Sequence, residues 1–101
     1  MEQLSDGSYK IHSGTKNVVL NAYAYKPADK TKVNVYKFTD DEYISTQLWK
    51  IEPLEDGSYT VRLKYNENLV LAATGKGNGA SVVVAKYDAK SELQKWIFIE
   101  E

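Results

Sequence analysis

The sequence predicts an all-β protein made of two copies of one four-stranded unit, and two repeated patterns carry this prediction. The tetrapeptide Asp-Gly-Ser-Tyr occurs at residues 6–9 and again at 56–59. The tripeptide Gln-x-Trp closes each unit and contains the only two Trp residues of the chain, Trp49 and Trp96. Self-similarity at a fixed period marks a repeat architecture. We therefore divide a single domain, 1–101, into repeat one (6–55) and repeat two (56–101).

Repeat one contains four short segments with the pattern of β-strands. The third segment alternates strictly, which is the period of a half-buried strand, and places Asn34 and Tyr36 on one face and Val35 on the other. Proline lacks the amide hydrogen that a strand ladder needs, so Pro27 and Pro53 mark breaks. The four expected strands are 9–12, 17–23, 33–38 and 48–52.

Repeat two follows the same order of strands and turns. Asn66–Asn68 is expected to form a turn, and the glycine-rich stretch 75–79 ends in Asn-Gly, a strong hairpin signal. A single helical turn is expected within 88–93. The four expected strands are 59–63, 69–72, 82–84 and 95–99. Eight short strands separated by turn signals are typical of a β-sandwich or barrel.

Composition and charge argue against several classes of partner. Thirteen basic and 14 acidic residues give a net charge of -1. No basic cluster follows one face, as a phosphate-tracking surface requires, so nucleic acid is not an expected partner. The chain has no run of 18 apolar residues, so no membrane span is expected. The stretch from Glu2 to Lys10 is polar, so we do not expect it to be a signal peptide. Cysteine is absent, which excludes disulfides and thiolate metal sites.

The repeated module carries a family resemblance. It consists of Asp-Gly-Ser-Tyr, then Asn-x-Val-Leu at 17–20 with its counterpart at 68–71, then Gly-Ala-Ser-Val at 79–82, and finally Gln-x-Trp. This module resembles the ricin-B-type β-trefoil repeat of lectins. The resemblance implies three repeats around a pseudo-threefold axis, with Trp49 and Trp96 in a common core and the Gln fixing the closing hairpin. It also implies a secreted or extracellular protein.

The chain departs from that family pattern because it holds two repeats instead of three. An incomplete trefoil exposes core residues and unpaired strand edges. Three solutions are open. Identical chains supply each other's missing repeat, as in a trimer whose six repeats close two trefoils. A different protein or a further segment supplies it. Alternatively, the two repeats close alone into a smaller barrel or sandwich. We expect a homo-oligomer.

The resemblance also implies a shallow sugar site in repeat one. A sugar's apolar face stacks on an aromatic ring while paired donors and acceptors bind its hydroxyls. The site departs from the family at two positions, where Asn21 replaces an acid and Thr46 replaces an Asn. Tyr23 and Tyr25 are expected to cluster beside it. The candidate carbohydrate-binding residues are Asn21, Asn34, Tyr36, Thr46 and Gln47.

Repeat two lacks this set of side chains. The matching positions hold Ala72, Val83, Ala85 and Leu93, and only Gln94 is retained. Four aliphatic side chains form no hydrogen bonds, so no sugar site is expected there. The apolar strip is expected to pack in the core or to contact another chain.

Enzyme chemistry finds little support in the sequence. The single His, His12, is expected on the outward face of a strand, with no partner that would make it a base. The acidic run 40–42 lacks the spaced oxygen ligands of a calcium loop. The glycines of 75–79 lack the Lys-Ser/Thr ending of a phosphate loop. We therefore expect neither catalysis nor a metal nor a cofactor.

Two functional hypotheses remain. The first is a non-catalytic, lectin-like module that binds a glycan or small sugar. The second is a protein-interaction or assembly subunit, of the kind that accompanies toxins, whose sugar site has decayed. A third, weaker reading is inhibition of another enzyme through a loop such as 26–30.

Overall fold

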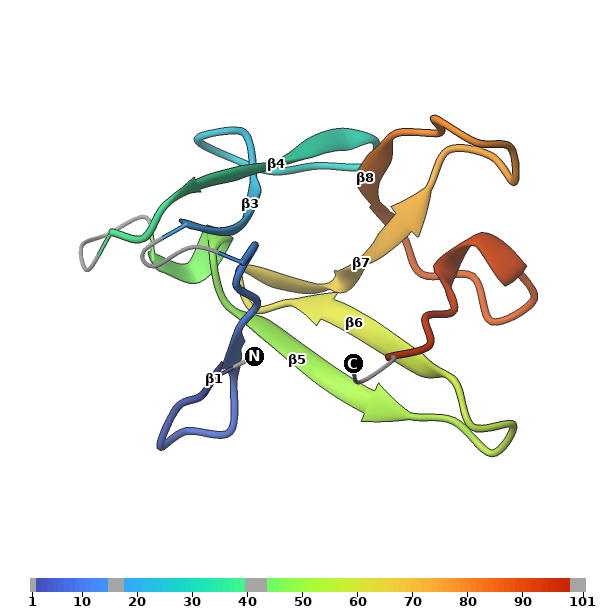
Figure 1. Cartoon of the computed structure of the whole chain (residues 1–101), viewed down its shortest axis with the longest axis horizontal. Helices are drawn as coiled ribbons and strands as arrows, with labels where there is room; N and C mark the ends of the chain where they lie inside the picture. The colour runs from blue at the N-terminus through green and yellow to red at the C-terminus, as the bar shows by residue number, and fades with distance from the viewer. Residues whose placement is uncertain (1, 15–17, 40–43, 99–101) are drawn as a thin grey trace.

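The computed structural model describes residues 2–14, 18–39 and 44–98, and these residues confirm an all-β fold. Eight strands form one sheet in the order β1-β2-β5-β6-β7-β8-β4-β3. Two short 3-10 helices, η1 and η2, precede the two Trp residues (Figure 1). The elements are β1 Glu2–Gln3, β2 Tyr9–Lys10, β3 Val18–Ala22, β4 Thr31–Lys37, η1 Ile44–Thr46, β5 Trp49–Pro53, β6 Tyr59–Leu63, β7 Asn66–Ala73, β8 Val82–Lys86 and η2 Glu92–Gln94.

The repeated Asp-Gly-Ser-Tyr stretch forms the same tight turn twice. In the first turn the amide of Leu4 donates to the carbonyl of Ser8. In the second turn the amide of Leu54 donates to the carbonyl of Ser58. Each Asp carboxylate accepts from the amide and the hydroxyl of the Ser two residues later. Gly7 and Gly57 have φ values of 91° and 88°, which favour glycine. The turns join β1 to β2 and β5 to β6.

The core lies between the repeats. Trp49 is fully buried, and its indole nitrogen donates to the carbonyl of Leu20 at 3.2 Å. The indole of Trp96 makes the equivalent bond to Leu71 at 2.8 Å, but its ring is only partly buried. The buried cluster comprises Ala22, Trp49, Val61, Leu63, Leu69, Leu71 and Val84. The expected core role of Trp49 is therefore confirmed, and Trp96 packs at the margin of this cluster.

Several expected strand boundaries were wrong. Residues 66–68 belong to β7, because the turn lies at Lys64–Tyr65 and Leu63 pairs with Asn66. In the last expected strand, Trp96 forms only an isolated bridge with Tyr59. The short strand β1 takes its place in the count of eight, since Gln3 pairs with Tyr9. The strand expected at 9–12 ends at Lys10. The helical turn expected within 88–93 forms instead at 92–94.

The two repeats are joined in two places: β5 of repeat one pairs with β6 of repeat two from Trp49–Leu63 to Pro53–Tyr59, and the third strands, β4 and β8, meet at their ends. Thr31 and Lys32, at the start of β4, pair with Val84 and Val83 of β8. The amide of Lys30 donates to the carbonyl of Val84 at 2.8 Å. These contacts hold the β3–β4 and β7–β8 hairpins side by side (Figure 1). None of the helices among the described residues is long and apolar enough to cross a membrane.

Candidate functional site

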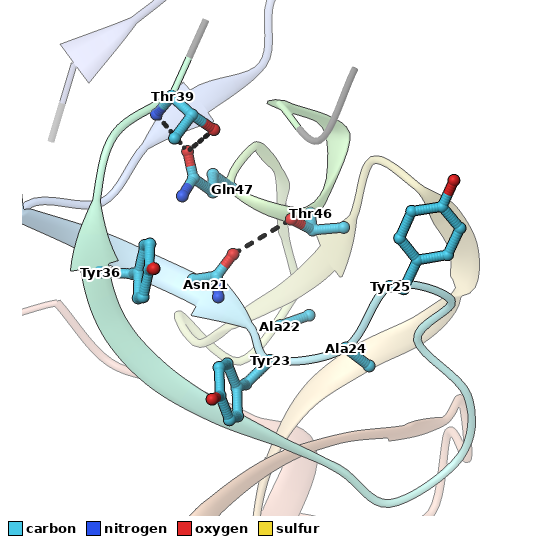
Figure 2. Close-up of a pocket in the computed structure, with 9 residues that line it drawn as sticks. All are labelled: Asn21, Ala22, Tyr23, Ala24, Tyr25, Tyr36, Thr39, Thr46 and Gln47. Atoms are coloured by element: carbon cyan, nitrogen blue, oxygen red, sulfur yellow. Dashed lines mark hydrogen bonds between the residues drawn. The ribbon is translucent and has the colours of Figure 1, made fainter. Parts of the chain in front are cut away.

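A cleft of about 470 Å³ opens in repeat one between the β3–β4 hairpin and η1. Figure 2 shows the polar side chains of Asn21 and Thr46 between the rings of Tyr36 and Tyr25. None of the described lining residues is charged. The lining residues are Asn21, Ala22, Tyr23, Ala24, Tyr25, Tyr36, Thr39, Thr46 and Gln47.

Asn21 forms the floor of this cleft. It lies on β3 directly opposite Asn34 of β4, and its side chain is 8% exposed. The Asn21 amide nitrogen donates to Oδ1 of Asn34 at 3.1 Å, and its Oδ1 accepts from the Thr46 hydroxyl at 3.1 Å. These two bonds fix which end of the amide is donor and which is acceptor. An amide has a further N–H and a further lone pair for a ligand.

Three tyrosines rise from the edges of the cleft. Tyr36 projects from β4, two residues beyond Asn34 and on the same face of the strand. Tyr36, Tyr23 and Tyr25 are 51%, 63% and 66% exposed. In Figure 2, Tyr36 lies to the left of Asn21, Tyr23 lies below it, and Tyr25 lies to the right, beyond Thr46. Exposed tyrosines offer a flat apolar surface with a polar tip.

Gln47 serves the fold more than the cleft surface. Its Oε1 accepts from the amide of Thr39 at 2.8 Å, and its Nε2 donates to the carbonyl of Lys37 at 3.0 Å. Gln94 does the same in repeat two, where it accepts from the amide of Asp88 and donates to the carbonyl of Lys86. Both Gln side chains are buried. Each therefore ties the 3-10 turn before its Trp to the end of the third strand.

The structure brings most of the expected site residues together. Four of the five, Asn21, Tyr36, Thr46 and Gln47, line the cleft. Asn34 lies outside the lining and acts through its hydrogen bond to Asn21. Sequence reasoning missed Thr39, which donates to Gln47 through both its amide and its hydroxyl. Thr39 could have been found from its position in the repeat. The equivalent residue of repeat two, Asp88, also follows the third strand, and its amide donates to Gln94 in the same way.

The other stretches considered for catalysis, metal binding or phosphate binding form no such site among the described residues. His12 is partly buried and lies 3.4 Å from the carboxylate of Glu2, so it is paired rather than simply solvated. The described residues hold no group of three metal-ligating side chains. The acidic run 40–42 lies outside the described residues. The stretch 75–79 is a turn, with Gly79 at φ 80°. In repeat two, Ala72 replaces Asn21 and is buried.

Comparison with known proteins identifies the family to which this chain belongs. The family described as "Ricin-type beta-trefoil lectin domain-like" matches residues 1–87. The chain belongs to this family. The match spans all of repeat one and the first three strands of repeat two. No curated protein sequence matches the chain significantly.

Solved structures support the same fold. A designed 3-fold symmetric protein, ThreeFoil, is 22% identical with a TM-score of 0.86, and the match covers 99% of this chain and 69% of that one. A mosquitocidal holotoxin is 21% identical with a TM-score of 0.81, covering 95% of this chain and 12% of the toxin chain. A mutant of the earthworm lectin C-terminal domain in complex with 6'-sialyllactose is 20% identical with a TM-score of 0.69, and the match covers 91% of this chain and 64% of that one. The β-trefoil fold inferred from the Gln-x-Trp repeats is thereby confirmed.

Proposed function

We propose that this ricin-type module binds glycans through the repeat-one cleft and performs no catalysis. The observation that carries the proposal is the convergence of Asn21, Thr46 and Tyr36 in one cleft. Tyr36 is the stacking platform, and Asn21 is the principal hydrogen-bonding group. Thr46 and Asn34 orient the Asn21 amide, and Gln47 holds the surrounding backbone.

The chemistry of the cleft favours uncharged sugar hydroxyls. A sugar hydroxyl is both donor and acceptor, and so is an amide whose two ends are held in fixed orientation. The described lining residues include no cation that would select an anionic sugar. The tyrosine rings match the apolar face of a pyranose. The lectin family and an earthworm lectin of the same fold support glycan binding in general, and the preference for an uncharged sugar rests on the lining of this cleft alone.

A single site of this kind binds weakly, because shallow polar sites retain little free energy after desolvation. Linking two or more sites raises avidity by about 10²–10⁴-fold. We therefore propose that the chain acts as a homo-oligomer, which displays several repeat-one clefts together. We also propose an extracellular location, where glycans are displayed. Secretion assays in the source organism test that location.

The decisive experiment is a glycan array with the wild type and two tyrosine variants. Tyr36→Ala removes the platform and should abolish the signal while the protein remains folded. Tyr65→Ala is the matched control, because Tyr65 is 41% exposed and lies outside the lining of the cleft. Unchanged glycan binding by folded Tyr36→Ala would refute the assignment of the site.

A second candidate is an assembly or protein-interaction subunit. The observation that favours it is the aliphatic strip of repeat two, in which Val83, Ala85 and Leu93 remain partly exposed. A partner that covers such a strip gains about 25 cal/mol per Å² of apolar area removed from water. If the chain binds no glycan and stays a monomer until a partner protein is added, this function replaces the first.

A further inference from the structure

Equivalent positions in the two repeats differ in burial. Val35 and Val84 are equivalent positions, because Thr31 aligns with Ala80 and each valine comes four residues later. Val35 is 48% exposed, whereas Val84 is fully buried. Trp49 is fully buried, whereas Trp96 is partly exposed. Each repeat therefore has one covered side and one uncovered side.

The covered sides meet at a known junction. There, Thr31 pairs with Val84 and Lys32 pairs with Val83, and the Lys30 amide bonds to the Val84 carbonyl. The backbone of Lys30 has φ 71°, a conformation rare for residues other than glycine. The start of one third strand thus docks on the end of the next.

The uncovered sides of the two repeats carry residues equivalent to those that form this junction. Ala80 and Ser81 correspond to Thr31 and Lys32, and Gly79, at φ 80°, corresponds to Lys30. Asn34 and Val35 correspond to Val83 and Val84. A largely apolar hollow of about 390 Å³ lies between these two halves. Its lining residues are Leu20, Val33, Asn34, Val35, Leu71, Ala80, Ser81, Val82 and Trp96.

We propose that this hollow is an interaction surface that takes one four-stranded repeat from another copy of the chain. The entering repeat uses the existing junction twice. The end of its third strand pairs with Ala80–Ser81, and the start of its third strand pairs with Asn34–Val35. The two sides of the hollow are the repeat equivalents of the two strand ends that already meet between repeats one and two, so the same backbone pairing can form there with another copy.

Geometry limits the occupant to one repeat at a time. In a threefold fold, two repeats fill two thirds of a turn, and this chain spans 69% of the symmetric ThreeFoil chain. An intact second copy that docked through the same junction would place its other repeat in the space that repeat one or repeat two already fills. A copy therefore enters only when its two repeats separate at the connection between β5 and β6, residues 53–59.

Three copies satisfy this geometry. Two copies each keep both repeats together, and the third gives one repeat to each of them, so six repeats close two trefoils. The third copy loses its β4–β8 junction and its β5–β6 ladder of five residue pairs, and four repeat–repeat junctions form in the two closed trefoils. Because repeats that exchange places use contacts they already make, this is a form of domain swapping. The inference deepens the proposed homo-oligomer by naming its surface and the unit exchanged.

The test is the solution mass of the full chain by light scattering at several concentrations. The wild type should reach three times the mass of one chain. Val35→Lys and Ala80→Glu each place a charge in the hollow and should shift the protein to monomer. Both residues are exposed in the single chain, so both variants should remain folded. Ile97→Lys is the matched control, because Ile97 is 73% exposed, and Lys50 occupies the equivalent position in repeat one.

A second readout follows Trp96 directly. With Trp49→Phe, Trp96 is the only indole, and acrylamide quenching should fall as the trimer forms. With Trp96→Phe, the buried Trp49 should show constant quenching. A wild type that stays monomeric overturns the proposal, as does a dimer of intact copies or a Val35→Lys variant that remains trimeric. Glycan binding is read separately on the array, so a monomeric Val35→Lys variant that still binds a sugar supports both the surface and the cleft, because Val35 lies outside the cleft lining.

Discussion

The hydroxyl of Thr46 donates to Oδ1 of Asn21 across 3.1 Å, and this bond joins the turn before Trp49 to the second strand of repeat one. Asn34 completes the arrangement by accepting from the other end of the same amide. The relationship matters because it holds a neutral amide where the family resemblance leads one to expect an acid. The donor and acceptor ends of the Asn21 amide are therefore fixed by its hydrogen bonds to Thr46 and Asn34, and no charged group is involved.

Asn21→Asp should strengthen glycan binding about fivefold, because hydrogen bonds to a charged acceptor exceed neutral ones by about 1 kcal/mol. Thr46 can still donate to the carboxylate, and the Asn34 amide must rotate to donate in its turn. An NMR titration with a glycan identified on the array measures the change. Asn21→Ala should lose binding, and an Asn21→Ala variant with wild-type affinity would show that the floor does not contact the sugar.

Gln47→Ala and Gln94→Ala should each lower the free energy of unfolding by about 2–4 kcal/mol. Each removes a buried amide that bonds to two backbone groups, and those groups are then left without partners. Urea denaturation measures the loss. Gln3→Ala is the control, since Gln3 is exposed and makes one long bond of 3.4 Å, and should change little. Equal stabilities of all three variants would contradict the role given to the Gln-x-Trp glutamines.

Stability should fall on acidification through two matching aspartates. The bonds that Lys64 and Ser8 donate hold the pKa of Asp6 well below its usual range, and the bonds from Ser58 lower the pKa of Asp56. A carboxyl whose folded pKa is lowered adds stability above its unfolded pKa of about 3.9 and loses it as the pH falls further. Thermal melts from neutral pH to below that value should show the loss. Asp6→Asn keeps an oxygen acceptor for Ser8 and should flatten the curve.

Lys30, at the repeat junction, and Gly79, its counterpart in repeat two, both have positive φ values, and substitutions there should act in opposite directions. Gly79→Ala should cost about 1 kcal/mol, because the left-handed conformation is unfavourable for a residue with a Cβ. No atom lies within 4 Å of an added Cβ there, so the cost is one of backbone strain. Lys30→Gly should be neutral or stabilise by up to about 1 kcal/mol. Denaturant unfolding of the two variants checks the sign of each effect.

Local patterns in the sequence were sufficient for the repeat architecture. The Asp-Gly-Ser-Tyr turns, the alternating strands and the Gln-x-Trp closures depend on nearby residues, so they were visible without a structure. Tyr36, Asn21 and Thr46 were placed in one site through the family resemblance. Residues 66–68 were misassigned as a turn because polar residues also occupy the exposed start of β7.

The sequence alone determined that there are two repeats and which of them keeps a polar face. The tertiary structure decided what each residue does there. It showed that Asn34 orients Asn21 through a hydrogen bond. It also showed that the Gln47 side chain bonds to the backbone of Lys37 and Thr39. It also separated the two Trp residues, which are equivalent in sequence. Trp49 is buried because repeat two packs over it, whereas Trp96 stays partly exposed because burial depends on neighbours that sequence position does not specify.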